Sequence, residues 1–476
     1  MNTLTAAVQN TLCAAGLWRE DAVLLCAISG GCDSVALLHA LCCLRQEKPF
    51  QLYAVHVQHH LRGEASQTDE RFVRQLCHRL RVPLAVEDAQ LSGDMHTPGM
   101  ETLARERRLR IFEGQMAALG AHALLTAHHR DDQTETVLMH LLRGSGLHGL
   151  CGMQVQTPFG SGWLLRPFLT LTRQQLQSAL AAGGLSWRED ESNRQPVTPR
   201  NLLRLETLPR LETLFPGAGA HIAQLAETLS ADDMFLQQEA GRLYLSIRQT
   251  RAPLFMLAVA PLARAPEALR RRVLRRWYLD GLRLAGLEPG ERALSHADTL
   301  ALSALVGQPA PARLNLPCSL MAARQTDWLH LVRQNGQPLC AAQPACHTVC
   351  AAQARYELDF LTLAASPPGA LPGDAHSVIL TPEWLARKPV LRPPQAADRI
   401  RPFGSPGHKP LRRYLTDAKI DPFLRPALVV LAVQNEVLWI PGLCTGEALR
   451  LEAVPQEGIE LSISGETPFI PKSPKE

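Results

Sequence analysis

The sequence predicts an α/β protein with three parts: an N-terminal parallel-sheet domain, a helical middle domain and a small α+β C-terminal domain. Two observations support this prediction. In residues 1–205, apolar runs of strand-like composition alternate with helical patterns, which is typical of βαβ units with helices on both faces of a parallel sheet. Breaks rich in Pro and Gly follow at 208–218 and at 365–374. The domains are therefore expected at 1–205, 210–340 and 380–466.

The strands of the first domain are expected at four apolar runs, which are AVLLCAI at 22–28, QLYAVHV at 51–57, VPLAVE at 82–87 and AHALLTA at 121–127. In such sheets, ligands bind at the carboxyl ends of the strands. Polar residues occur at those ends, with Ser29 after the first run, His56 in the second and 128–135 after the fourth. In the C-terminal domain, 427–433 and 437–440 are expected to form a hairpin.

The composition is that of an ordinary globular protein. Hydrophobic residues make up 46% of the chain and charged residues 20%, and 49 Lys and Arg against 45 Asp and Glu give a net charge of +4. This charge is too small to indicate nucleic-acid binding by itself. The N-terminus has no basic segment before an apolar one, and no apolar run approaches the ~20 residues that span a bilayer. A cytoplasmic protein with no membrane partner is therefore expected, and the sequence leaves a homodimer open.

Twelve cysteines are scattered along the chain without a CxxC pair. This usage predicts reduced thiols rather than a disulfide framework. The cluster of Cys340, Cys346, His347 and Cys350 has the spacing of no standard zinc module, so a loose interdomain segment is expected there. The tail 468–476 is expected to be disordered.

A phosphate-binding loop is predicted where the first strand ends. Residues 29–34 are SGGCDS, and a helical pattern follows from Val35. Gly30 and Gly31 let the backbone turn and bring N–H groups close to an anion, while the helix N-terminus adds partial positive charge. The loop contains neither GxxxxGK[ST] nor GxGxxG. It resembles the SGGxDS signature of the PP-loop ATP pyrophosphatases, which adenylate an oxygen and release pyrophosphate.

A second polar cluster lies in 127–136, AHHRDDQTET, where a strand is expected to lead into a helix. Asp132 and Glu135 are three residues apart, so both carboxylates face one side of the first helical turn, where they can hold Mg²⁺ or a substrate ammonium group. Taken alone, they are better explained as exposed acids that complement the helix dipole. The segment resembles the HxxDDxxET element of the tRNA(Ile)-lysidine synthetases.

Further segments resemble the same family in order and spacing. They are HVQHHLR at 56–62 for HVxHxLR, ARERRL at 104–109 for ARxxRY, RGSGLHGL at 143–150 for RGSGxxGL, RPFL at 166–169 for RPLL, DESN at 190–193 for DxSN and RNLLR at 200–204 for RNxxR. His60 stands where the family has Gly, and Leu109 replaces its Tyr. The resemblance covers 22–205 and 398–445, and the middle of the chain loosely.

The resemblance implies a ligase that forms a C–N bond. ATP would adenylate the C2 carbonyl oxygen of the wobble cytidine in the isoleucine tRNA with the CAU anticodon, and free lysine would displace AMP to give lysidine. The implied catalytic residues are Asp33, Asp132, Glu135 and Arg200. The implied ATP-binding residues are Ser29, Gly30, Gly31, Cys32, Asp33, Ser34 and His56, and Mg²⁺ would be held by Asp33 and Asp132. The implied tRNA contacts of the first domain are Arg62, Arg108, Asn193 and Arg204.

Two basic stretches lie outside the first domain. In 269–278, LRRRVLRRWY, an apolar stripe runs beside cationic ridges that include Arg271 and Arg275, which fits a solvated helix face and a phosphate-binding face equally. The run 399–425 carries seven Lys or Arg against two acids and resembles the C-terminal domain of the same synthetases. Its candidate tRNA contacts are Lys409, Arg412 and Arg413.

Other interpretations share some of these features. A tRNA thiolase with the same loop also acts on a base carbonyl, but it needs catalytic cysteines, often in CxxC pairs, which this sequence lacks. An amidating synthetase shares SGGxDS without the DESN and RNxxR series. An RNA-binding scaffold on an inactive PP-loop is disfavoured by the intact Asp33, Asp132 and Glu135. Arg200 and Arg204, taken alone, are typical of an ordinary helix surface, and His56 is at least as well explained by packing.

Overall fold

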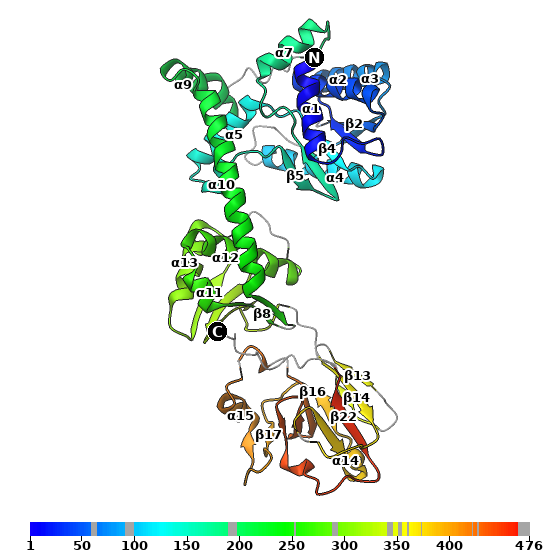
Figure 1. Cartoon of the computed structure of the whole chain (residues 1–476), viewed down its shortest axis with the longest axis vertical. Coiled ribbons are helices and arrows are strands. Elements are labelled where there is room, and N and C mark those ends of the chain that lie inside the picture. Colours follow the sequence, from blue (N-terminus) through cyan, green and yellow to red (C-terminus); the bar gives the residue numbers. More distant parts are fainter. Residues whose placement is uncertain are drawn as a thin grey trace. The chain divides into compact units, whose positions relative to one another are not determined.

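The computed structural model describes residues 1–58, 64–90, 100–188, 198–251, 254–287, 294–339, 346–350, 355–358, 361–372, 374–420, 422–425 and 428–464. The chain divides into two compact units, Met1–Phe235 and Leu236–Glu476 (Figure 1). The boundary expected between 205 and 210 falls inside the first unit. Four residues singled out in the sequence, together with the tail, lie outside the described residues: His60, Arg62, Asn193, Cys340 and 468–476.

The first unit contains a six-stranded sheet in the order β3-β2-β1-β4-β6-β5. Its neighbours are parallel from β3 to β6, and β5 pairs with β6 in the antiparallel direction. The strands are β1 Val23–Ala27, β2 Gln51–Gln58, β3 Leu84–Asp88, β4 Ala123–Leu125, β5 Gln156–Phe159 and β6 Gly162–Leu165. The parallel sheet predicted from the four apolar runs is therefore confirmed, and the β5–β6 hairpin is an addition at one edge.

Alternate residues of the central strand face two separate cores, as the period of two in a strand requires. Leu24 and Cys26 face a core shared with the helices on one side of the sheet, whereas Leu25 faces a second core that contains Phe112 and Met116. The helices of this unit are α1 Asn2–Ala14, α2 Cys32–Glu47, α3 Glu64–Arg79, α4 Met100–Leu119, α5 Arg130–Leu142, α6 Leu147–Leu150, α7 Arg173–Ala182, α8 Pro199–Leu202 and α9 Leu208–Leu214. A short π-helix, Leu203–Thr207, joins α8 to α9, and α10, Ala218–Ile247, runs from the first unit into the second.

The second unit begins with helices, as expected, but it also contains a five-stranded antiparallel sheet in the order β7-β8-β11-β10-β9. The sheet was not expected because its strands are rich in Leu, Ala and Met, which carry a weak intrinsic strand signal. Burial supplies the missing preference, since all five residues of β8 are buried. The elements are β7 Arg248–Arg251, β8 Leu254–Ala258, α11 Val259–Arg264, α12 Glu267–Leu284, α13 His296–Gly307, β9 Ala312–Leu316, β10 Leu320–Gln325 and β11 Trp328–Arg333.

The C-terminal part of this unit contains two further sheets. One has the order β12-β16-β19-β20-β17-β18 with β21 paired to β20, and the other has the order β13-β14-β22-β15. The predicted hairpin is confirmed, because β19 and β20 are antiparallel and Gln434 at their turn has a φ of 52°. The elements are β12 His347–Thr348, β13 Arg355–Leu358, β14 Leu361–Ser366, β15 Ser377–Leu380, α14 Pro382–Ala386, β16 Val390–Arg392, β17 Arg399–Ile400, β18 Lys409–Pro410, α15 Leu411–Asp417, β19 Val430–Val433, β20 Glu436–Ile440, β21 Cys444–Thr445, the 3-10 helix Glu447–Leu449 and β22 Ile459–Ile463.

The structure bears on two expectations that were drawn from composition: the absence of a membrane-spanning segment and the loose segment around Cys346, His347 and Cys350. In the part of the chain that the structure describes, no helix combines the length and apolar character that crossing a membrane requires. Cys346, His347 and Cys350 lie at and beside β12, where His347 pairs with Leu391. The described part of the segment thus contributes a strand to a sheet rather than a loose connection. Among the described side chains, no group of three or more His, Cys, Asp and Glu residues could hold a metal ion.

Candidate active site

The loop after β1 is closed by hydrogen bonds between its own residues. The Ser34 hydroxyl donates to the Gly31 carbonyl oxygen at 3.0 Å and lies 3.1 Å from the Ser29 hydroxyl, while the Ser29 N–H donates to Ser34 Oγ at 3.2 Å. Gly30 has a φ of +91°, and a Cβ there would lie 3.2 Å from Val73 Cγ2. The loop therefore requires Gly at this position, and it leads directly into α2, whose N-terminus favours an anion.

The segment after β4 begins helix α5 with a histidine in the capping position. The Asp132 N–H donates to His129 Nδ1 at 3.4 Å, and the His129 N–H donates to Asp132 Oδ2 at 3.1 Å. This reciprocal pair is a capping box in which His replaces the usual Ser or Thr. The cap places Asp132 and Glu135 in the first turns of α5 with their carboxylates on one side, as predicted.

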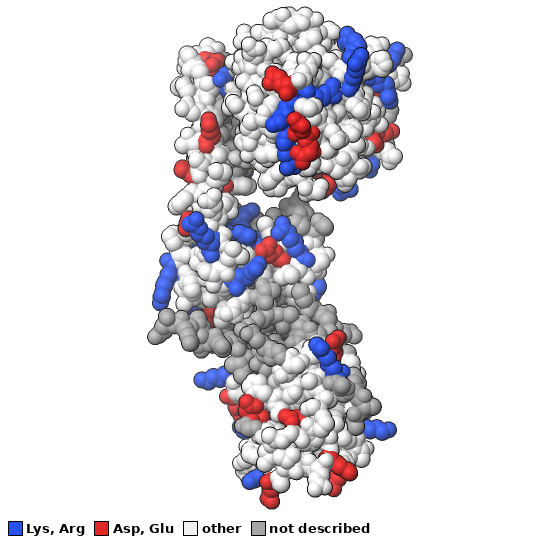
Figure 2. All heavy atoms as spheres, turned by 45° about the vertical axis from the view of Figure 1, so that its right-hand side comes forward, with Lys and Arg blue, Asp and Glu red and all other residues white. Residues whose placement is uncertain are grey.

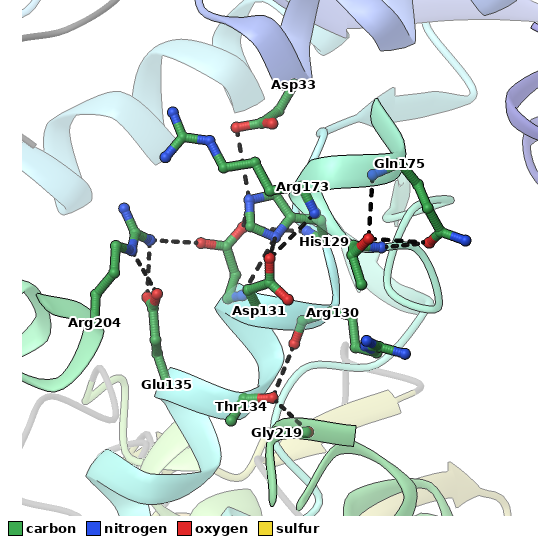
Figure 3. A network of polar contacts seen from close by, with 12 residues as sticks. Asp33, His129, Arg130, Asp131, Thr134, Glu135, Arg173, Gln175, Arg204 and Gly219 are labelled. Atoms are coloured by element: carbon green, nitrogen blue, oxygen red, sulfur yellow. Dashed lines mark hydrogen bonds and ion pairs between the residues drawn. The ribbon is translucent and has the colours of Figure 1, made fainter. Parts of the chain in front are cut away.

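His129 also reaches the loop of residues 29–34 (Figure 3). Its Nε2 lies 3.6 Å from Asp33 Oδ2 and 3.4 Å from Asp132 Oδ2, and the residue is only 3% exposed. The second oxygen of Asp33, Oδ1, is buried without a hydrogen-bond partner in the described part of the chain. Two carboxylates from neighbouring strand ends thus converge on one point, and an unpaired oxygen remains available there.

Glu135 is fully buried and is held by two arginines, of which Figure 3 shows Arg204. Arg200 Nε donates to Glu135 Oε2 at 2.7 Å, and Arg204 Nε donates to Glu135 Oε1 at 2.6 Å. Both arginines also donate through Nη2 to Asp132 Oδ1 at 3.2 Å. Arg204 lies in the π-helix, a distortion that is frequent at functional sites. Two interpretations are therefore wrong: the acids are not exposed dipole partners, and the arginines are not an ordinary helix surface.

The ionisation of the site follows from burial and charge together. Burial alone would lower the pKa of His129, but the neighbouring carboxylates of Asp33 and Asp132 outweigh it and raise that pKa. Burial also opposes ionisation of Asp132, yet the charges of His129 and Arg200 lower its pKa. For His128, burial is decisive and lowers the pKa to about 4. At neutral pH the Asp132 carboxylate is thus ionised and His128 is neutral.

The remaining candidates of the first unit occupy distinct positions. His56 is buried at the end of β2, and its Nδ1 donates to the Ile28 carbonyl oxygen at 2.8 Å. Cys32 is buried in the first turn of α2, and Arg108 is exposed on α4. The structure therefore gathers Asp33, Asp132 and Glu135 with the two arginines, and His56 supports the backbone next to the loop.

The candidates of the second unit lie on two helices. In α12, Val273 and Trp277 are buried as the predicted apolar stripe, Arg271 pairs with Glu267, and Arg275 is exposed. Figure 2 shows several Lys and Arg side chains on the helical part of this unit with few acids among them. In and next to α15, Arg412 and Arg413 are exposed and Lys409 Nζ lies 3.7 Å from Asp417.

Sequence reasoning missed two residues of the site. His129 stands at an unassigned position of HxxDDxxET, and the signal that could have found it is its place immediately before a helix with Asp three residues later. Arg188 holds the loop in place from a distant segment of the chain. Its backbone N–H donates to the Gly30 carbonyl oxygen at 3.0 Å, and its Nε donates to Asp69 at 3.1 Å. No local pattern indicates a contact between segments so far apart in the sequence.

Comparisons with known proteins add an independent observation. Residues 2–211 match the PP-loop domain family, and residues 390–462 match the TilS substrate C-terminal domain. The chain is 32% identical over 454 residues to a tRNA(Ile)-lysidine synthase of Geobacter sulfurreducens, covering 92% of each chain. It is 41% identical over 283 residues to that of Serratia proteamaculans, covering 58% of this chain and 63% of the relative. Among solved structures, the U34-tRNA thiolase NcsA of Methanococcus maripaludis covers 48% of this chain and 78% of its own, with a TM-score of 0.41 at 15% identity.

Proposed function

The chain belongs to the tRNA(Ile)-lysidine synthase family, and from this premise we propose which of its residues carry out each step of lysidine formation. It is a ligase that forms a C–N bond, binds ATP through its PP-loop domain and acts on tRNA. In the proposed sequence of steps, the C2 carbonyl oxygen of the wobble cytidine attacks the α-phosphorus of ATP and pyrophosphate leaves. The ε-ammonium group of lysine loses a proton, the resulting amine attacks C2, AMP leaves, and the nitrogen of the new C–N bond loses a second proton.

One observation carries the assignment of roles. The loop of 29–34 and the acids of α5 meet through His129 at neighbouring strand ends, so a nucleotide held by the loop has its phosphates beside two carboxylates and two guanidinium groups. Such a site combines a polyphosphate cradle with groups that bind the ammonium form of an amine and stabilise developing negative charge. An adenylation that is followed by the attack of an amine requires both kinds of group.

The loop residues serve the nucleotide. Backbone N–H groups at the start of α2 and the hydroxyl of Ser29 contact the phosphates, and Gly30 gives the loop its turn. Asp33 and Asp132 would hold Mg²⁺, which favours oxygen ligands, and the unpaired Asp33 Oδ1 fits that role. When bound, the ion neutralises charge on the polyphosphate.

Glu135 of α5 serves the nucleophile. It binds the ammonium group of lysine and orients its amine, while Arg200 stabilises negative charge as the cytidine oxygen is adenylated. Because both arginines already neutralise both carboxylates, a guanidinium that turns to the phosphate of the adenylated base releases a carboxylate for the ammonium group. The charge of the site stays balanced during this exchange.

The second unit and α4 serve the tRNA. The exposed Arg275, Arg412 and Arg413 contact phosphates of the tRNA without reading its sequence, and Arg108 contacts it near the site. The relatives from Geobacter sulfurreducens and Serratia proteamaculans are tRNA(Ile)-lysidine synthases, which favours lysidine formation over the thiolase alternative.

Multiple-turnover release of pyrophosphate from ATP tests the proposal. The release is expected to require both an isoleucine tRNA transcript with the CAU anticodon and lysine, because lysine clears the adenylated base for the next turnover. Release that needs the tRNA but not lysine would point to another nucleophile, and release that needs neither would reject a tRNA-modifying reaction.

A further inference from the structure

We propose that His129 is a positioning residue, which holds Asp33 of the loop and Asp132 of α5 at the spacing that a divalent cation on the ATP phosphates requires. The inference rests on the proposed function, because it assumes that these carboxylates bind the cation. It goes beyond that function by assigning a role to a side chain whose position in the HxxDDxxET pattern is unassigned.

The two ring nitrogens of His129 have different tasks. Nδ1 accepts the Asp132 N–H at 3.4 Å, and this bond fixes the ring at the start of α5. A nitrogen that accepts a hydrogen bond leaves the proton on the other nitrogen. Nε2 therefore faces Asp33 Oδ2 at 3.6 Å and Asp132 Oδ2 at 3.4 Å as a donor.

This placement joins two elements that come from different strands. Asp33 lies on α2, which follows β1, and Asp132 lies on α5, which follows β4, the neighbour of β1 in the sheet. Among the described residues, the Asp33 carboxylate makes one ion pair or hydrogen bond, which is the contact of its Oδ2 with His129 Nε2. His129 is thus the link that sets the direction of Asp33 relative to α5.

The charges explain why a donor is needed at this point. His129 is 3% exposed and faces three carboxylates, those of Asp33, Asp131 and Asp132, with Asp131 Oδ2 at 3.8 Å from Nδ1. Carboxylates that converge without a positive or donating group between them repel one another. Without the Nε2 donor, Asp33 is expected to turn away from Asp132, and the oxygens then no longer converge on one cation.

A competing explanation assigns His129 to the helix cap alone, and two substitutions separate the explanations. His129→Asn retains an acceptor at the position of Nδ1 and is a good N-cap, but it is too short to reach Asp33. His129→Gln places a donor near the position of Nε2 and is a poor N-cap. Thr172→Ala is the matched control, because Thr172 caps α7 with the same capping box and has no contact with Asp33 in the described structure.

Two quantities are measured on the full-length enzyme. Electron paramagnetic resonance gives the dissociation constant of Mn²⁺ in the presence of ATP, and thermal unfolding without ligand gives the melting temperature. In His129→Asn, the Mn²⁺ dissociation constant is expected to rise about tenfold or more, as on removal of a residue that orients metal ligands, with a melting temperature near that of the wild type. His129→Gln should bind Mn²⁺ more tightly than His129→Asn and melt at a lower temperature. Thr172→Ala should melt lower with unchanged Mn²⁺ affinity.

Wild-type Mn²⁺ affinity in His129→Asn would overturn the inference. So would a ranking of Mn²⁺ affinities that follows the melting temperatures across all variants, because it would show that His129 acts through the cap. A wild-type enzyme that binds Mn²⁺ and ATP but transfers no lysine to tRNA would instead reject the proposed function and leave the role of His129 standing.

Discussion

At the scale of single residues, the site depends on charges that neutralise one another out of water. The helical spacing of Asp132 and Glu135 predicted that they share a face, and the structure agrees. The spacing could not reveal that Glu135 is fully buried, because the arginines that compensate its charge lie more than sixty residues later in the chain. Whether a charged side chain can be buried depends on such distant partners. A single sequence does not show which distant residues come into contact.

We expect Glu135→Gln to reduce stability as well as lysine transfer. Removing one member of a fully buried ion pair costs about 3–5 kcal/mol. Arg200 and Arg204 are 30% and 26% exposed and keep Asp132 as a partner, so a loss of about 1–3 kcal/mol is expected in denaturant unfolding. The exposed Glu206 on the adjacent π-helix is the control, and Glu206→Gln should stay within about 0.5 kcal/mol of the wild type. Equal effects of the two variants would show that Glu135 is an ordinary helix acid.

His128 gives the protein a defined response to acid. Its pKa is lowered from 6.5 to about 4 in the folded state, and burial is the largest cause. Between these two values the unfolded chain binds the proton and the folded chain does not, so stability falls as the pH falls, with a slope of up to about 1.4 kcal/mol per pH unit. Unfolding free energies measured from pH 7 to pH 4 should therefore decline more steeply for the wild type than for His128→Gln. Parallel curves would contradict the depressed pKa.

At the scale of elements, the sequence predicted a helix or strand correctly where the local residue pattern and the burial of the element favour the same conformation. The alternation of apolar runs and helical patterns predicted the parallel sheet, and the glycine loop lies between β1 and α2 as expected. The sheet of the second unit was missed because Leu, Ala and Met in β8 and β10 favour helices when taken alone. Their strand conformation is imposed by packing against α12 and α13, which no local window can show.

The loop makes a prediction at this scale. Gly30→Ala introduces a Cβ at a φ of +91° and 3.2 Å from Val73, so the loop must shift and lose its fit to phosphate. We expect ATP affinity, measured by equilibrium binding, to fall at least about tenfold, which corresponds to about 1.4 kcal/mol. Gly16→Ala is the matched control, because Gly16 has a φ of +68° and nothing within 4 Å of its Cβ position. If Gly30→Ala binds ATP as tightly as Gly16→Ala, the loop does not hold the nucleotide.

At the scale of the whole molecule, the chain combines a unit with the chemistry and a unit with exposed cations. The first holds the loop and the network around His129, and the second carries the basic surfaces of α12 and α15. The sequence predicted the basic residues but not which of them are free to meet phosphate. Arg271 is paired with Glu267, whereas Arg275, Arg412 and Arg413 are exposed.

We expect charge reversal at Arg412 and Arg413 to weaken tRNA binding without changing ATP affinity. The tRNA KM should rise, and the plot of log affinity against log salt should flatten by about one unit for each tRNA phosphate that the variant no longer binds. Arg450→Glu is the control, because Arg450 already pairs with Glu447 on the same unit. An unchanged salt slope in the Arg412 and Arg413 variants would show that this surface is merely solvated.

The central claim is that the network joining Asp33, Asp132 and Glu135 forms lysidine on the wobble cytidine. Its most direct test is incorporation of labelled lysine into isoleucine tRNA transcripts that carry C or U at the wobble position, by the full-length wild type and by Asp33→Asn. The account predicts ATP-dependent incorporation into the C transcript alone, and its loss in a folded Asp33→Asn enzyme, which lacks the charge beside the polyphosphate. Incorporation into the U transcript, or undiminished incorporation by Asp33→Asn, would contradict it.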